Sequence, residues 1–355
     1  MKILHLAASN RWTGAAAPAL AETKALRGAG FDAHFAYVGG YKFEQRLVEK
    51  EWAHPVILKR EDPLSIARSV AAIRTLVDSL GIDILHSHLT YDHWLSRFAA
   101  RGRRVAVVRT YHARRTIRRD PGTRWLLRGT SAVCVVNSSF VSDRALLPSA
   151  PRFTPPPVDH RFYTEGGRDE TRKKYGLNRD SLVIGVIGKI APRRGFEEAI
   201  DTFRIVRGTN ADARLLVIGH GPHRSELEAE IGALGLTDSV IWAGYHEDDL
   251  PEHFSAMDAL LFTRTGSDEG HRAVIESMAC GTPVFSYPIE GVSELYQNER
   301  ERFVAGGKDP VSLAALVLAR LEKSTEERAL ARQISLEFGF DRTAEKLTAL
   351  YRELS

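Results

Sequence analysis

Residues 266–283 read Gly-Ser-Asp-Glu-Gly-His-Arg-Ala-Val-Ile-Glu-Ser-Met-Ala-Cys-Gly-Thr-Pro. The pattern predicts a strand end, a short polar loop and a helix that stops at Gly281 and Pro283, because glycine and proline terminate helices. Asp268 stands at the helix entry, and Glu276 follows eight residues later. Because a helix N-terminus attracts anions, we expect this stretch to bind an anionic group between two carboxylates.

Each acid also has an ordinary structural interpretation. Asp268 alone is typical of an N-cap, and Glu276 alone is typical of a solvated ion pair with Arg272. The combination favours a ligand site, because the free N–H groups from residue 270 to Arg272 attract phosphate. The ionised carboxylate of Glu276 is an acceptor only, which suits the two hydroxyls of a ribose.

Buried strands and helix-period segments alternate along the whole chain. Apolar runs of strand length lie at residues 2–7, 33–38, 82–86, 106–109 and 132–136, and again at 182–187, 214–218, 240–242, 259–262 and 284–286. Two successive runs of strand and helix predict an α/β protein of two doubly wound parallel sheets. Ligands bind outside the carboxyl ends of the strands in such sheets.

Proline and glycine mark the boundary between the two halves. Three consecutive prolines at 155–157 cannot continue a sheet or a helix, and the glycine pair at 166–167 adds a joint. We expect a first domain over 1–163, a second over 164–335, and a C-terminal helix over 336–355 that crosses back to the first domain.

Composition limits the classes of function. The chain has 355 residues, 43% hydrophobic and 26% charged, as expected of a globular protein with two domains. No apolar run reaches the ~18–20 residues that cross a bilayer, and the first residues lack the pattern of a signal peptide. Cys134 and Cys280 are too few for a disulfide framework or a cysteine metal cluster, so we expect a reducing, cytoplasmic location.

Positive charge gathers in the first half. Residues 1–165 hold 25 Lys and Arg against 14 Asp and Glu, a formal charge of +11, whereas the remainder holds 24 against 31, or −7. Seven arginines lie within 109–128, and a solvated helix face is one interpretation of that run. The other is a surface for anionic lipid or a phosphorylated acceptor. The arginines assigned to that surface are Arg114, Arg115, Arg118 and Arg119. We expect no nucleic-acid partner, because no binding motif accompanies the charge.

Two loops that follow predicted strands suit a diphosphate. The loop after 182–187 carries Lys189 and Arg194, five residues apart, which would hold phosphate oxygens. Taken singly, both are typical of surface charge. Residues 219–222 form a Gly-His-Gly-Pro turn whose glycines permit close approach of a ligand to the backbone.

A histidine pair and a glycine follow predicted strands of the first half. His88 lies just past a strand that contains His86, so we expect it to face a cleft between the domains; a structural histidine is the alternative. The pair suggests a metal, but the sequence offers no evident third ligand, and we predict no metal site. Gly14 ends the loop after the first strand and leaves room for a ligand near the backbone.

Together these motifs resemble the family-4 retaining glycosyltransferases of the GT-B architecture. The similarity covers almost the whole chain and is strongest over 182–310, where the Gly-Lys loop, the Gly-His-Gly-Pro turn, Trp242-Ala-Gly244, the acid-x7-acid helix and Met278-Ala-Cys-Gly-Thr-Pro-Val284 keep the family's order. The resemblance implies two Rossmann-like domains that face each other across a cleft. It implies transfer of a sugar, with retention, from a nucleotide diphosphate sugar, with no cofactor and no metal ion.

The resemblance also implies a role for each matching residue. Glu276 binds the donor ribose, and Asp268 stands at the sugar. Lys189 and Arg194 hold the diphosphate and stabilise the leaving group. His88 matches a histidine that contacts the donor sugar, and it completes the implied catalytic set. The implied donor-binding set further includes Gly14, Gly188, Gly219, Gly244, Tyr245, Glu269, Gly270, His271 and Arg272.

The chain departs from the family pattern in the first acid. That acid is usually Glu followed by Gly, and the dipeptide Glu269-Gly270 fits only with one residue deleted. The spacing from Glu276 selects Asp268, which we assign. Lys189 replaces the usual arginine and lacks its bidentate fork.

We therefore expect an enzyme of cell-envelope glycan biosynthesis at the inner face of an anionic membrane. The donor is a UDP-sugar, or else a GDP-sugar, and the acceptor is a glycan, a lipid-linked sugar or another hydroxyl compound. Two alternatives stay open: a nucleotide-sugar 2-epimerase of the same architecture, and an inactive GT-B-like binding or scaffold protein. A Rossmann dehydrogenase fits poorly, because no Gly-x-Gly-x-x-Gly follows the first strand.

Overall fold

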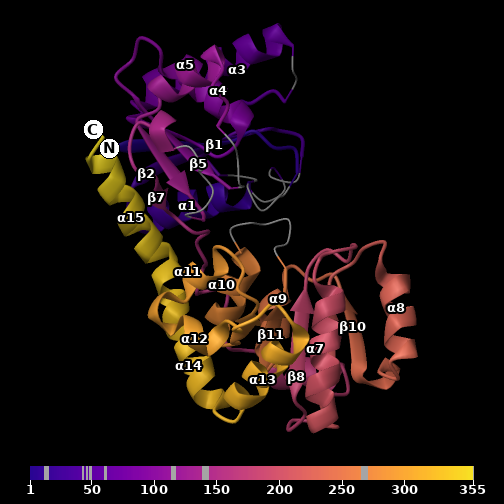
Figure 1. Ribbon diagram of the computed structural model, residues 1–355. Helices are drawn as coiled ribbons and strands as arrows, with labels where there is room; N and C mark the ends of the chain where they lie inside the picture. Colours follow the sequence, from indigo (N-terminus) through magenta and orange to yellow (C-terminus); the bar gives the residue numbers. More distant parts are fainter. Residues whose placement is uncertain are drawn as a thin grey trace. The chain divides into compact units, whose positions relative to one another are not determined.

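The computed structural model divides into two compact units (Figure 1). It describes residues 1–11, 16–41, 44, 47, 50–59, 62–112, 117–137, 144–264 and 271–354. The first unit holds the described residues of 1–157 and 338–354, and the second holds those of 158–264 and 271–337. The boundary thus falls at the prolines, a few residues before the predicted one, and the last helix belongs to the first unit.

The first unit is built on a seven-stranded sheet in the order β3-β2-β1-β4-β5-β6-β7, in which every pair of neighbours is parallel. The strands are β1 (Lys2–Ala7), β2 (Asp32–Tyr37), β3 (Ala53–His54), β4 (Ile84–Ser87), β5 (Ala106–Tyr111), β6 (Ala132–Val135) and β7 (Arg152–Phe153). The edge strands β3 and β7 were not predicted, because two residues are too short to show a periodicity.

Helices α1 (Ala17–Gly28) and α15 (Phe340–Arg352) lie side by side in this unit (Figure 1). Ile3 of β1 and Ile84 of β4 are fully buried in one cluster with Leu26 of α1 and Leu347 of α15. The last helix therefore completes the core on one face of the first sheet.

Helices α3 (Pro63–Leu80) and α4 (Thr90–Ala100) pack together in a second cluster. Leu4 and Leu85, next in the chain to Ile3 and Ile84, join this cluster. Successive side chains of a strand point to opposite faces, so the two clusters lie on opposite sides of the sheet. A further helix, α5 (Pro121–Arg128), packs against α4.

The second unit is built on a five-stranded parallel sheet in the order β10-β9-β8-β11-β12. The strands are β8 (Val183–Ile187), β9 (Arg214–Ile218), β10 (Val240–Gly244), β11 (Ala259–Phe262) and β12 (Val284–Ser286). The helices are α6 (Arg168–Lys174), α7 (Phe196–Thr209), α8 (Arg224–Ala233), α9 (Leu250–Ala256), α10 (Arg272–Ala279), α11 (Val292–Leu295), α12 (Arg300–Phe303), α13 (Pro310–Leu321) and α14 (Ser324–Ser335). The predicted fold class, two doubly wound parallel sheets, is confirmed.

Strand order reverses once in each sheet. The chain builds outward from β1 to β3 and then starts again at β4 on the other side of β1. In the second sheet it builds from β8 to β10 and starts again at β11, on the other side of β8. A crevice forms where the order reverses, at the carboxyl ends of the strands, and ligands of such folds bind there.

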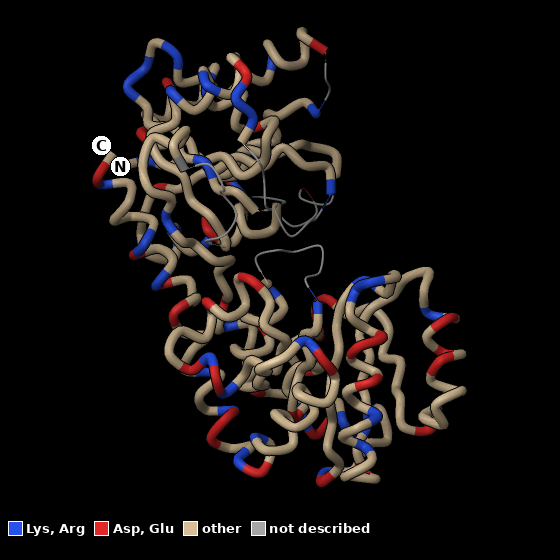
Figure 2. The backbone as a smooth tube through the Cα atoms, in the orientation of Figure 1, with Lys and Arg blue, Asp and Glu red and all other residues tan. Residues whose placement is uncertain are grey.

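Charge differs between the two units. Figure 2 shows Lys and Arg around α3 to α5 of the first unit, and Asp and Glu along α7 and α8 of the second. This distribution agrees with the charges counted along the sequence. Among the described residues, no helix combines the length and the apolar character needed to cross a membrane.

Gly219 sets a test of the second unit's fold. Its φ is +137°, and a Cβ atom there would lie 1.9 Å from the carbonyl oxygen of Gly188. We expect Gly219→Ala to lower the free energy of unfolding by about 2 kcal/mol or more, since it adds a clash to backbone strain. Gly208→Ala in α7 is the control, because a Cβ there meets no atom within 4 Å, and a gain of about 0.5–1 kcal/mol is expected. Urea unfolding measures both, and a Gly219→Ala protein as stable as the parent would contradict the packing described.

Candidate functional site

Three loops meet at the carboxyl edge of the second sheet. The N–H of Gly188, after β8, donates to the carbonyl of Ile218 at 3.0 Å, and the N–H of Gly219, after β9, donates to the carbonyl of Gly244 at 2.7 Å. The backbones of Gly188 and Gly219 approach so closely that no side chain fits at Gly219. The structure therefore brings the predicted residues Gly188, Gly219 and Gly244 together.

The loop between β8 and α7 presents two basic side chains. Lys189 is exposed and Arg194 is half-buried. Within the described part of the chain, neither makes a hydrogen bond or an ion pair, so both are available to a ligand. Arg193 between them has φ +60°, a left-handed conformation that a non-glycine residue adopts at a cost.

Gly195, the N-cap of α7, packs against the end of β11. Its φ is +88°, and a Cβ there would lie 2.4 Å from Oγ1 of Thr263. The Thr263 hydroxyl donates to the Gly195 carbonyl at 2.6 Å. The start of α7 is thus fixed at the point where strand order reverses, between β8 and β11.

A cavity of about 580 Å³ lies beside this point. Its volume falls within the range of small-molecule sites, about 300–1,000 Å³. Glu198 and Arg264 on its wall form an ion pair at 2.5 Å. The cavity is lined by Arg193, Glu198, Thr263, Arg264, Tyr287, Ile289, Glu290 and Lys308. None of these residues was singled out from the sequence, because four separate loops and helix α7 contribute them.

Glu276 lies within α10 and is only 4% exposed. Its Oε1 accepts a hydrogen bond from the hydroxyl of Tyr163 at 2.6 Å and lies 3.1 Å from Nε of Arg272. The predicted pair with Arg272 exists, with the carboxylate buried and the Arg272 side chain 33% exposed. Burial and the Glu276 carboxylate raise the pKa of the Tyr163 hydroxyl, so it stays a donor. Tyr163 was assigned to the end of the first domain, and its contact with Glu276 was missed.

The start of α10 is set by His271. This residue is the N-cap in a left-handed conformation, with φ 54° and ψ 38°. Its Nε2 donates to the carbonyl of Glu290 at 3.1 Å, which ties α10 to the loop that lines the cavity. Asp268, Glu269 and Gly270 lie outside the described residues, as does Gly14 of the first unit.

Tyr245 follows β10 and is 60% exposed. Its ring meets the ring of His220 edge-on, with centroids 5.3 Å apart. His220 belongs to the turn after β9. The carboxyl edge of the sheet therefore carries an exposed aromatic surface beside Gly244.

The predicted arginine surface of the first unit is only partly described. Arg118 and Arg119 are exposed, whereas Arg114 and Arg115 lie outside the described residues. Arg118 lines a cavity of about 470 Å³ together with Trp94 and Tyr111. Arg109, counted in the same run, is instead 3% exposed, because it belongs to β5.

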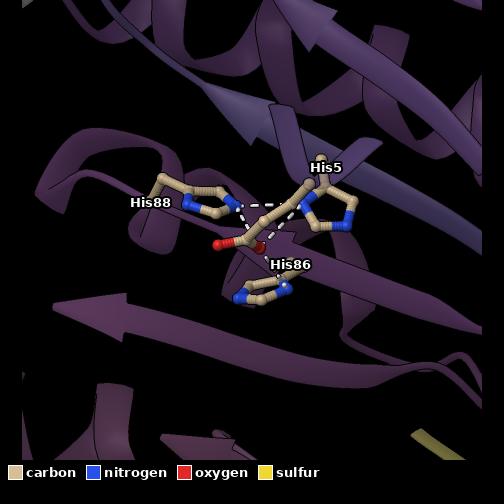
Figure 3. Close-up of side chains that lie close together, drawn as sticks. His5, His86 and His88 are labelled. Carbon is tan, nitrogen blue, oxygen red and sulfur yellow. Dashed lines mark hydrogen bonds and ion pairs between the residues drawn. The ribbon is translucent and has the colours of Figure 1, made fainter. Parts of the chain in front are cut away.

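His88 lies inside the first unit rather than at its surface, with an exposure of 1%. Its Nε2 is 2.9 Å from Nδ1 of His5, and its Nδ1 is 3.0 Å from Nε2 of His112 (Figure 3 shows His5, His86 and His88). Of the two interpretations of His88, a residue that faces a cleft between the domains and a structural histidine, its burial favours the second.

The sequence predicts no metal site at His86 and His88, because it shows no evident third ligand beside them. The structure supplies His5, which is the register partner of His86 in the β1–β4 pair, and Glu22 of α1. Burial lowers the pKa of His5 to about 3, so its ring is neutral at pH 7. Burial raises the pKa of Glu22 to about 8. The premise of the sequence argument was therefore wrong.

Two family models match the chain. The model described as "Glycosyl transferases group 1" matches residues 167–335, and the model described as "Glycosyltransferase Family 4" matches residues 12–161. Each match falls almost wholly within one of the two structural units.

Several enzymes are similar in sequence. The 2-deoxystreptamine glucosyltransferase of Streptomyces kanamyceticus is 29% identical over 192 residues, 52% of this chain and 49% of that enzyme. The D-inositol 3-phosphate glycosyltransferase of Acidothermus cellulolyticus is 23% identical over 301 residues, 76% of this chain and 67% of that enzyme. The chain thus spans about half to two thirds of the length of these relatives.

Solved structures share the fold. A glycosyltransferase from Rickettsia africae ESF-5 superimposes with a TM-score of 0.83 at 16% identity, over 99% of this chain and 98% of that one. Anabaena HepE in complex with UDP gives a TM-score of 0.79 at 18% identity, over 99% and 100% of the two chains. These likenesses confirm the GT-B fold that the sequence motifs implied.

The buried carboxyl of Asp92 sets a pH test of the first unit. Burial raises its pKa to about 6, opposed by Arg109 at 3.9 Å and by the N–H groups of Leu89, Ala8 and His88. The pKa of Asp92 is higher in the folded state than in the unfolded chain. The stabilising contribution of this carboxyl is therefore present below about pH 4 and is lost as pH rises through 6.

Asp92→Asn removes this titration while keeping an acceptor for Leu89. We expect the variant to gain stability relative to the parent between pH 4.5 and pH 7, by on the order of 1–3 kcal/mol. Urea unfolding of both proteins at the two pH values measures the difference. A constant difference across this range would show that Asp92 keeps its ordinary pKa.

Proposed function

The chain belongs to glycosyltransferase family 4, and on that premise we propose that it is a retaining enzyme that transfers a sugar from a nucleotide diphosphate sugar to a hydroxyl acceptor. The single observation that carries this proposal is the arrangement at the carboxyl edge of the second sheet. Among the described residues, Lys189 and Arg194 have no protein partner there. They lie beside the backbone segments at the ends of β8, β9 and β10, which hydrogen bonds of Gly188 and Gly219 hold together.

We assign the donor to the second unit. The diphosphate is held by Lys189 and Arg194, whose charges oppose those of its oxygens. The ribose hydroxyls bind Glu276, which Tyr163 and Arg272 hold in place. The nucleobase lies against the backbone at Gly244 and the exposed ring of Tyr245. A UDP-sugar is favoured, because UDP and UDP-glucose are bound in structures of HepE, which shares the fold.

The proposed chemistry is a displacement on one face of the sugar. The bond between the anomeric carbon and the diphosphate oxygen breaks, and the acceptor oxygen forms the new bond on the same face. The acceptor proton passes to the departing phosphate. Lys189 and Arg194 stabilise the negative charge that develops on this leaving group, an electrostatic effect worth several kcal/mol in such sites. Asp268, or Glu269 in its place, orients the sugar, and the mechanism uses no metal ion.

We assign the acceptor to the first unit. The cavity lined by Arg118, Trp94 and Tyr111 offers a cation beside aromatic rings, which suits a sugar with an anionic group. One relative is named for a phosphorylated acceptor, D-inositol 3-phosphate. We leave His88 out of the catalytic set, because both of its ring nitrogens bind other histidines.

Substitution at the donor site tests the proposal. We expect Glu276→Gln to lower kcat/KM for transfer by about 100-fold, since it removes the charge that binds the ribose hydroxyls, and to leave the unfolding transition in place. Tyr163→Phe, which removes only the hydrogen bond to Glu276, is expected to cost about tenfold. Glu226→Gln on α8 is the matched control. The measurement is release of UDP from a panel of UDP-sugars, with the thermal shift given by UDP.

Product analysis separates the alternatives. A new sugar formed from the donor without acceptor would identify an epimerase. A folded protein that gives no thermal shift with UDP, GDP or ADP would support the inactive scaffold. Normal transfer by Glu276→Gln would contradict the donor site proposed here.

Liposome binding tests the proposed contact with an anionic membrane. Arg118 and Arg119 are exposed on the first unit, and each basic residue near an anionic surface is worth about 1 kcal/mol. We expect the double variant Arg118→Ala, Arg119→Ala to bind vesicles that contain phosphatidylserine about 30-fold more weakly. Arg204→Ala with Lys323→Ala in the second unit is the control of equal charge. Binding that does not depend on the anionic lipid content would rule out this electrostatic contact.

A further inference from the structure

Four side chains from β1, α1 and β4 converge inside the first unit. They are His5, Glu22, His86 and His88, and none is more than 1% exposed. Figure 3 shows the three histidine rings close together. One nitrogen from each ring and one oxygen of Glu22 all lie within 4.8 Å of one another. The cluster sits where strand order reverses between β1 and β4, toward the carboxyl ends of these strands.

The separations between these atoms fit a tetrahedral metal ion. Oε2 of Glu22 lies 3.8 Å from Nδ1 of His5, 3.9 Å from Nδ1 of His86 and 3.7 Å from Nε2 of His88. Nδ1 of His5 and Nε2 of His88 are 2.9 Å apart. Zinc bonds of about 2.0–2.1 Å place tetrahedral ligands about 3.3–3.4 Å apart, so each of these four separations lies within about half an ångström of that value.

The other nitrogen of each ring already has an acceptor. Nε2 of His86 lies 2.7 Å from Oγ1 of Thr110, and Nε2 of His5 lies 3.3 Å from the hydroxyl of Tyr351. Nδ1 of His88 lies 3.0 Å from Nε2 of His112. Histidine ligands of metals nearly always donate their second N–H to such an acceptor, which fixes the tautomer. All three rings meet this condition.

Without an ion, the same residues form a hydrogen-bonded chain that omits Glu22. The Tyr351 hydroxyl lies 2.6 Å from Nδ1 of His86, and Nε2 of His88 lies 2.9 Å from Nδ1 of His5. Among the described residues, Oε2 of Glu22 then has no hydrogen-bond partner. A carboxyl oxygen buried without a partner carries an uncompensated cost of desolvation. An ion among the three rings removes this cost. Binding of an ion leaves His88 with its N–H on Nδ1, directed at Nε2 of His112.

We propose that Nδ1 of His5, Oε2 of Glu22, Nδ1 of His86 and Nε2 of His88 bind one divalent ion of the zinc class in the core of the first unit. Three imidazoles and one carboxylate are a typical ligand set for zinc. When the ion binds Nδ1 of His86, the Tyr351 hydroxyl loses its hydrogen bond to that nitrogen and still accepts one from Nε2–H of His5. The four protein ligands close the coordination shell, so the ion is structural and is separate from the donor site.

The charges around the site are accounted for. Glu22 neutralises one charge of the ion. The positive charge of Arg109 disfavours protonation of His86 and His88. The Asp92 carboxylate lies 3.9 Å from the Arg109 guanidinium and opposes its charge. The ion joins β1 and the next element, α1, to the end of β4, which lies far from both in the sequence, and thereby stabilises the sheet at the point where its order reverses.

A second group in the other unit provides the control. His246, Asp249 and His253 also gather potential ligand atoms. However, Nδ1 of His253 already donates to the Asp249 carbonyl at 2.7 Å, and His246 bridges the Asp249 carboxylate and the Ala243 carbonyl at 2.8 and 2.9 Å. Their hydrogen bonds are satisfied without an ion, so His253→Gln should not change metal binding.

Metal analysis of the full-length protein tests the proposal. Protein stripped with a chelator and then dialysed against Zn²⁺ is expected to retain one equivalent and to gain thermal stability. Co²⁺ in its place is expected to give the intense visible bands of a four-coordinate site. Thr110→Val removes the hydrogen-bond partner of the His86 ligand and should weaken Zn²⁺ binding by about 10–100-fold. Glu22→Gln removes a ligand itself and should weaken Zn²⁺ binding by more than that. His253→Gln should bind as the parent does.

The measurements also decide against the proposal. Folded parent protein that retains no Zn²⁺ and gives no Co²⁺ bands overturns it, as does parent-like affinity in Glu22→Gln or loss of binding in His253→Gln. Glu22→Gln places a neutral amide in the cluster, so it is expected to match the stability of the stripped parent and to gain none from Zn²⁺. If Glu22→Gln fails to fold, the Co²⁺ spectrum of the parent and the Thr110→Val affinity still decide. None of these readouts depends on transfer activity.

Discussion

The second unit depends on backbone contact between neighbouring loops at the carboxyl ends of its strands. The N–H of Gly219 donates to the carbonyl of Gly244, and the N–H of Gly188 donates to that of Ile218, so the parallel ladder continues past the strands. Because no Cβ fits at Gly219, these loops close to a distance that side chains would prevent. The adjoining loop, which carries Lys189 and Arg194, is thereby given a fixed base, and Lys189 is exposed while Arg194 is half-buried.

The carboxyl edges of the two sheets differ in what occupies the point where strand order reverses. In the second sheet, the reversal between β8 and β11 lies beside a cavity of about 580 Å³ with charged walls. In the first sheet, the reversal between β1 and β4 is filled by His5 and His86 and covered by α1 and α15. A crevice that is open in one unit is therefore occupied by protein side chains in the other. This difference separates a site for a small molecule from a site suited to a buried ion.

Much of the fold could be predicted from local pattern. The ten longer strands in the described part of the chain fall where apolar runs predicted them, because a strand buried on both faces requires such a run. Gly281 and Pro283 mark the end of α10, and the prolines at 155–157 mark the unit boundary, because both residue types restrict the backbone. The site was only partly predictable: the loop with Lys189 and Arg194 follows its strand as expected, whereas the cavity wall comes from four loops and helix α7.

The sequence by itself determined the fold class, the family and the loops that carry basic residues, because these follow from the periodicity and order of short segments. Only the tertiary structure decided which side chains meet. Tyr163 reaches Glu276 across 113 residues, and His5 meets His88 across 83. Such contacts depend on strand register and helix placement, which no local pattern contains. Burial likewise placed Arg109 and His88 in the interior: Arg109 lies beside Asp92 of α4, and His88 lies beside Glu22 of α1.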